Sequence, residues 1–119
     1  MTKMIIDDLK SKKFGNIVFI NSVAGLNPYK DSTAYVASKY GLRGFSSALR
    51  EELRDYNIKI ISIYSGAVNT PIWDDIVGDD IRSEMMDVDN VSDIIINAIN
   101  SPANCTTEEI TIRRVLGDF

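Results

Sequence analysis

The chain has 119 residues, 45% of them hydrophobic and 25% charged, and a net charge of −4. These values are typical of one globular domain over residues 1–119, and with Lys10–Lys13 as the only dense basic patch they give no support for nucleic-acid binding. Without histidine, and with Cys105 as the one cysteine, zinc sites, His-based triads and an internal disulfide are excluded.

The amino-terminal part predicts a helix followed by a buried strand. Residues 1–12 carry Ile5, Ile6 and Leu9 at near-helical spacing, as in the last turns of a helix. A strand near residues 16–20 follows, and its continuous apolar run is expected where a parallel strand is covered on both faces. Ser22 then lies at the carboxyl end of this strand, where open α/β sheets place ligands.

A long helix is predicted from Thr33 to about Asp55. Its apolar residues are spaced three and four apart: Leu42, Phe45, Leu49 and Leu53. Tyr35 and Lys39 extend this face, and because they are four residues apart the ammonium can lie beside the phenol. A nearby cation favours the phenolate form, which suits tyrosine for general acid or base catalysis.

The same helix has a second stripe that contains only small residues: Ala37, Gly41, Gly44 and Ala48. Glycine inside a helix costs about 1 kcal/mol relative to alanine, so a close backbone contact should compensate for it. The stripe packs either on the chain's own sheet or against a second copy of the chain.

The carboxyl-terminal half predicts two more strands, near residues 59–64 and 109–113. The first brings Ser65 to the same sheet edge as Ser22. Between the strands, residues 90–100 read as an amphipathic helix with Asp89 as the expected N-cap. We therefore predict an α/β fold whose three-stranded parallel sheet follows chain order and has helices on both faces.

The segment from Pro71 to Asp87 is predicted to be irregular, with some helical character. It contains Trp73, Met85 and Met86 among acidic residues. These three side chains either form an apolar pocket wall or belong to the core.

The positions of one serine, one tyrosine and one lysine are informative about function. Ser22 lies thirteen residues before Tyr35, and Tyr35 to Lys39 has the form Tyr-x-x-x-Lys. A later loop, Ser65-Gly66-Ala67-Val68-Asn69-Thr70, is like Pro-Gly-x-Val-x-Thr with serine in place of proline. In this ordered set the chain resembles the short-chain dehydrogenase/reductase family. The resemblance covers essentially the whole chain and implies a partial Rossmann, or doubly wound, fold.

The resemblance implies an oxidoreductase that moves hydride between NAD or NADP and a small-molecule carbonyl or secondary alcohol. It assigns Ser22, Tyr35 and Lys39 to catalysis, with Tyr35 giving or taking the proton. The residues implied to contact the cofactor are Tyr35, Lys39, Gly66, Val68 and Thr70. We also expect a homo-oligomer that is located in the cytoplasm. We expect no metal, nucleic-acid or membrane partner.

The family's glycine-rich cofactor turn, Gly-x-x-x-Gly-x-Gly, does not occur in this sequence. The chain therefore resembles the carboxyl-terminal half of such an enzyme. An alternative is a truncated, non-catalytic module that associates with itself or a partner through the open strand edge at Ile17–Ile20. The family also includes epimerases and dehydratases, although Gly66–Thr70 fits the dehydrogenases better.

Overall fold

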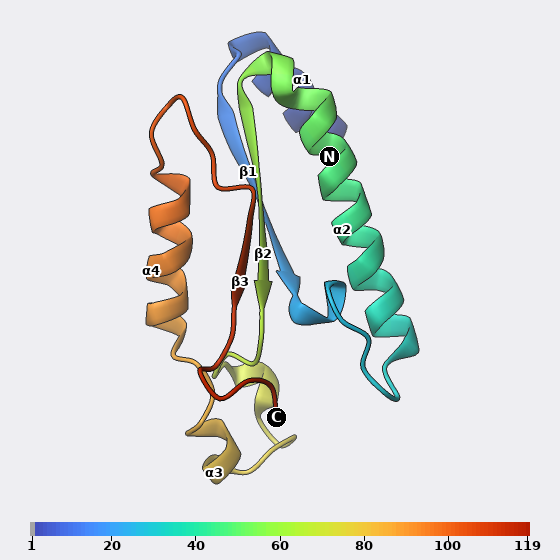
Figure 1. Ribbon diagram of the computed structural model, residues 1–119, viewed down its shortest axis with the longest axis vertical. Coiled ribbons are helices and arrows are strands. Elements are labelled where there is room, and N and C mark those ends of the chain that lie inside the picture. Colours follow the sequence, from blue (N-terminus) through green and yellow to red (C-terminus); the bar gives the residue numbers. More distant parts are fainter. Residues whose placement is uncertain (1) are drawn as a thin grey trace.

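The computed structural model describes residues 2–119 and has a sheet sandwiched between helices (Figure 1). α1 and α2 cover one face of the sheet, and α4 covers the other. The helices are α1 Thr2–Lys12, α2 Thr33–Leu53, α3 Asp79–Arg82 and α4 Val88–Ile99, and the strands are β1 Gly15–Ser22, β2 Ile58–Ser65 and β3 Glu109–Ile112. The α/β fold with helices on both faces is thus confirmed.

The sheet is parallel throughout and its strand order is β1-β2-β3, as predicted. Gly15 pairs with Ile58 at one end of the first two strands, and Ser22 pairs with Ser65 at the other. Because these strands start and finish level, the loops that follow Ser22 and Ser65 leave the sheet side by side.

β2 is the central strand, and its side chains alternate between two apolar layers. Ile61 and Ile63 are completely buried against the α4 side, whereas Ile60 points to the α2 side and packs with Leu49 and Leu53. Burial of one such side chain stabilises the fold by about 1.5–3 kcal/mol. The core is therefore centred on the strand that leads into the Ser65 loop.

β1 is less covered than its apolar run predicted. Ile17, Val18 and Phe19 are half-buried, and Ile20 is 58% exposed. Ile17 and Phe19 pack against the core on the α2 side and Val18 against the core on the α4 side, so both faces are covered, but only in part. β1 is an edge strand within residues 2–119, so it has a neighbour on one side only.

The amino-terminal cap of α4 differs from the predicted one. Asp87, not Asp89, is the N-cap, and its carboxylate accepts the Asp89 backbone N–H at 2.8 Å. Asp89 instead lies in the first turn, where its negative charge complements the helix dipole.

The small-residue stripe of α2 faces outward. Ala37, Gly41, Gly44 and Ala48 are all exposed. A Cβ atom added at Gly41 or Gly44 would meet nothing within 4 Å in the described part of the chain. The alternative in which the stripe packs on the chain's own sheet is therefore wrong. Contact of the stripe with a second copy of the chain remains a prediction.

Arg50 fixes the far half of α2 to the sheet. Its side chain is almost fully buried, and its guanidinium donates to Ile60 O at 3.1 Å, Ser62 Oγ at 3.3 Å and Glu108 O at 3.0 Å. Ser62 Oγ in turn donates to Ser46 Oγ at 3.1 Å. A single side chain thus joins α2, β2 and the segment that enters β3.

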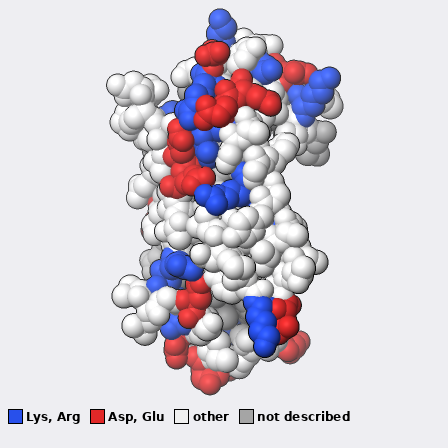
Figure 2. Space-filling view, turned by 45° about the vertical axis from the view of Figure 1, so that its right-hand side comes forward, with Lys and Arg blue, Asp and Glu red and all other residues white. Residues whose placement is uncertain are grey.

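Charged side chains on the surface are mixed in sign. In Figure 2, Lys and Arg lie beside Asp and Glu near both ends of the molecule, and uncharged side chains occupy much of the area between them. Within residues 2–119, no helix combines the length and the apolar character needed to cross a membrane.

Candidate active site

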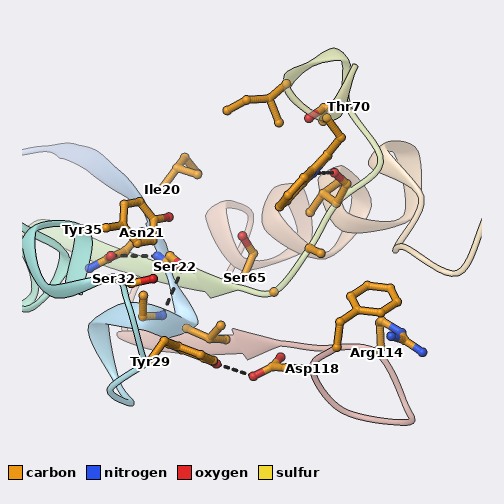
Figure 3. A pocket seen from close by; sticks show the side chains of 18 of the residues that line it. Ile20, Asn21, Ser22, Tyr29, Ser32, Tyr35, Ser65, Thr70, Arg114 and Asp118 are labelled. Carbon is orange, nitrogen blue, oxygen red and sulfur yellow. Dashed lines mark hydrogen bonds between the residues drawn. The ribbon is translucent and has the colours of Figure 1, made fainter. Parts of the chain in front are cut away.

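A pocket of about 630 Å³ opens at the carboxyl ends of β1 and β2 (Figure 3). Ser22 and Tyr35 form one side of it, and Thr70 and Arg114 lie on the other. Parallel α/β sheets bind ligands at this edge because the loops after neighbouring strands diverge there.

Ser22 ends β1 and begins a short 3-10 turn, Val23–Gly25. Its backbone is extended, with φ −136° and ψ 158°, and its Oγ accepts the Ala24 N–H at 3.2 Å. This bond is a helix N-cap, so the hydroxyl oxygen is held in place while the hydroxyl proton remains available to an acceptor in the pocket.

Asn21 joins the two parts of the site and was missed by sequence reasoning. It is 4% exposed, its Oδ1 accepts the Ser22 N–H at 2.7 Å, and its Nδ2 donates to Lys39 O at 3.2 Å. A Cβ added at Gly25 would lie 3.1 Å from both the Asn21 side chain and Lys39 O, so a larger residue there would force these neighbours to shift slightly. The only sequence signal was a polar residue directly after the apolar run of the predicted strand.

Tyr35 and Lys39 lie next to each other on the first turns of α2. Tyr35 is 51% exposed and lines the pocket, and Lys39 Nζ is 5.4 Å from the centroid of its ring. Lys39 itself is not among the pocket-lining residues. The ammonium therefore lies over the Tyr35 ring, close to the phenol as the four-residue spacing predicted.

Backbone hydrogen bonds hold the loop after β2 in place, although this loop begins with serine and not with the proline of the family pattern. Gly66 N–H donates to Ile112 O at 2.9 Å, and Val68 forms a parallel bridge with Met86. Trp73 Nε1 donates to Val68 O at 3.0 Å. Trp73 is half-buried in the pocket wall, which is one of the two alternatives that the sequence left open. Met86 packs against the core, which is the other.

Arg82 of α3 organises the rest of this loop. Its guanidinium donates to Asn69 Oδ1 at 3.0 Å and to Thr70 O at 3.3 Å, and it pairs with Asp74. The sequence did not single out Arg82, because its partners lie eight to thirteen residues away in an irregular segment.

The carboxyl-terminal segment closes the remaining side of the pocket. Tyr29 donates a hydrogen bond to the Asp118 carboxylate (Figure 3). This carboxylate also pairs with Arg113 at 2.7 Å. Burial, and then the hydrogen bond to Asp118, raises the pKa of Tyr29 above its ordinary value of 10.0. Residues 29 and 118 are so far apart in the chain that no local pattern could have paired them.

Of the predicted site residues, five line one pocket: Ser22, Tyr35, Gly66, Val68 and Thr70. They come from three segments that the sheet brings together. Among residues 2–119 there is no cluster of three or more His, Cys, Asp or Glu side chains placed to hold a metal ion.

Comparisons with known proteins give the family and the fold. Residues 1–80 match the family described as short chain dehydrogenase. The chain is 31% identical over 119 residues to sepiapterin reductase of Chlorobaculum tepidum, covering 100% of this chain and 48% of that protein.

Two solved structures are similar over nearly the whole chain. A closed form of serine dehydrogenase complexed with NADP+ has a TM-score of 0.75 at 26% identity, over 95% of this chain and 48% of that one. A metagenomic short-chain oxidoreductase in complex with NADP has a TM-score of 0.68 at 26% identity, over 90% and 41%. The chain spans about half the length of the relatives it matches.

Proposed function

This chain belongs to the short-chain dehydrogenase/reductase family, and we propose that its pocket serves hydride transfer between NAD(P) and a carbonyl compound or secondary alcohol. The observation that carries the proposal is the meeting of Ser22, Tyr35 and the Gly66–Thr70 loop around one pocket at the carboxyl edge of the sheet. Each group has a separate task in such a reaction.

The pocket residues fit the nicotinamide end of the cofactor. Val68 lines the pocket, and its N–H has no acceptor within residues 2–119, so it can donate to a carboxamide oxygen. Thr70 lies beside it with a hydroxyl that can donate or accept. When bound, the nicotinamide supplies or takes the hydride.

Proton transfer falls to the other side of the pocket. Ser22 Oγ is held by Ala24 N–H, so its O–H can donate a hydrogen bond to a substrate carbonyl oxygen. Tyr35 gives its phenolic proton to that oxygen during reduction and takes it back during oxidation. Lys39 lies over the ring with Nζ 5.4 Å from its centroid, so its positive charge is close to the side chain that gives up the proton.

A chimera tests this proposal. Because the chain aligns with 48% of C. tepidum sepiapterin reductase, it can replace that matched part of the relative. We expect the chimera to bind NADPH and to reduce a carbonyl compound, and Tyr35→Phe to abolish turnover while thermal unfolding stays unchanged and NADPH binding remains detectable.

The control is Tyr56→Phe, which removes a tyrosine hydroxyl outside the pocket. A folded chimera that binds NADPH and keeps its turnover after Tyr35→Phe would refute the assignment.

A second candidate function is a non-catalytic module that pairs with another chain. It is favoured by one observation, the open edge of β1, where Ile20 is 58% exposed. Such an edge offers unpaired backbone groups to an incoming strand. Light scattering separates the two candidates: replacing Val18 by proline removes a backbone donor from this edge, and it should reduce association only if the edge is the contact.

A further inference from the structure

The walls of the pocket are apolar and remain open to solvent. Three large apolar side chains line it and are more than half exposed: Ile20 at 58%, Ile72 at 73% and Phe119 at 61%. Trp73 adds an aromatic face, and its indole N–H is already bonded to Val68 O. A ligand that covers these side chains gains free energy in proportion to the apolar area it removes from water.

The charges of the pocket are largely neutralised by partners in the same chain. Arg114 Nη2 pairs with Glu84 at 3.0 Å, and the Asp118 carboxylate pairs with Arg113 at 2.7 Å and accepts the Tyr29 hydroxyl. The remaining charged side chain of the lining is Lys30, which is exposed. An exposed ammonium attracts an anion weakly because water screens it.

An anionic ligand would therefore lose hydration without a strong partner. An uncharged ligand avoids this cost and keeps the full benefit of the apolar walls.

We propose, on the basis of the function proposed above, that this pocket selects uncharged carbonyl compounds or alcohols that carry an apolar ring, and that Phe119 determines this specificity. The ring packs among Ile72, Trp73 and Phe119, and the carbonyl oxygen faces Ser22 and Tyr35. Tyr29 and Arg113 are positioning residues, because they bind Asp118 and so hold the adjoining Phe119 at the pocket.

Binding can be measured without cofactor or turnover. Trp73 is the one tryptophan of the chain, so a ¹⁵N-labelled sample gives a single indole N–H resonance from the pocket wall. The chain is titrated with three probes: acetophenone, the anion benzoylformate, and methyl benzoylformate, which has the same aryl ketone with the charge masked.

We expect acetophenone and methyl benzoylformate to shift the indole resonance in a saturable way, and benzoylformate to bind at least about tenfold more weakly. Phe119→Ala should weaken acetophenone binding about tenfold, the loss for about 60 Å² of apolar contact at about 25 cal/mol per Å². Tyr29→Phe should weaken it severalfold and speed amide exchange in residues 113–119, whereas the control Tyr56→Phe should change neither.

Equal or tighter binding of benzoylformate would overturn the selection against charge. Absence of a saturable shift with all three probes would overturn the pocket as the binding site, and unchanged acetophenone binding in Phe119→Ala would overturn the role of Phe119. These results are independent of the hydride-transfer proposal, which stands or falls on turnover and on Tyr35→Phe.

Discussion

Replacing Arg50 by methionine should destabilise the fold more than any surface charge change. Methionine keeps the apolar stem but removes the guanidinium, which makes hydrogen bonds to Ile60 O, Ser62 Oγ and Glu108 O. Hydrogen bonds from a charged donor contribute about 1.5–3 kcal/mol each, so three give an upper bound of about 9 kcal/mol. The variant no longer has to remove a guanidinium from water when it folds, and this offsets part of the lost hydrogen bonding. We therefore expect the free energy of unfolding to fall by about 2–4 kcal/mol.

Urea unfolding followed by circular dichroism measures this loss. The matched control is Arg54→Met, one turn along, because Arg54 makes ion pairs with Glu51 and Glu108 while 46% exposed. Exposed pairs contribute about 0–1 kcal/mol. If Arg50→Met cost no more than Arg54→Met, the clamp between α2 and the sheet would not have the strength that its contacts indicate.

Three further outcomes are expected. Gly44→Leu adds bulk to an exposed helix face, so light scattering should show a weakened oligomer if α2 meets its copy there, and an unchanged oligomer would exclude that contact. Burial and the nearby Glu109 carboxylate raise the pKa of Tyr64 above 10.0, so the unfolded chain releases this proton at a lower pH than the folded chain. The free energy of unfolding should therefore fall as pH rises above about 10. Urea midpoints measured from pH 9 to 11 should fall less steeply in Tyr64→Phe. Calorimetric titration of the chain with NADPH should give weak or undetectable binding, because the nicotinamide-side contacts alone must offset an association cost of about 4–15 kcal/mol; a micromolar dissociation constant would contradict this.

The sheet could be predicted because its signals are local. Runs of β-branched residues mark β1 and β2, and crossover helices between them require parallel pairing. The strand order also followed from the chain order. The exposure of Ile20 could not be predicted, because an apolar run reports what a strand is able to bury and not whether a neighbour is present to cover it.

The candidate site likewise contains some contacts that the sequence could predict and others that it could not. Tyr35 and Lys39 are one helical turn apart, so their proximity is a property of local geometry. Asn21 and Lys39 are brought together only by packing of α2 on β1, and the contact of Tyr29 with Asp118 joins segments on opposite ends of the sequence. Such contacts depend on the assembled sheet, and no spacing rule gives them.

The reacting side of the pocket is held by contacts made entirely within this chain. Near the pocket, the Asn21 amide ties the Ser22 backbone to Lys39 O, which fixes the end of β1 against the first turns of α2. At the other end of α2, Arg50 ties the helix to β2, which leads into the Ser65 loop. A helix fixed at two points about three turns apart can neither slide nor rotate freely, so the backbone positions of Ser22 and Tyr35 relative to each other are set by the fold. Such preorganisation would serve the proton transfer that we propose for this pocket.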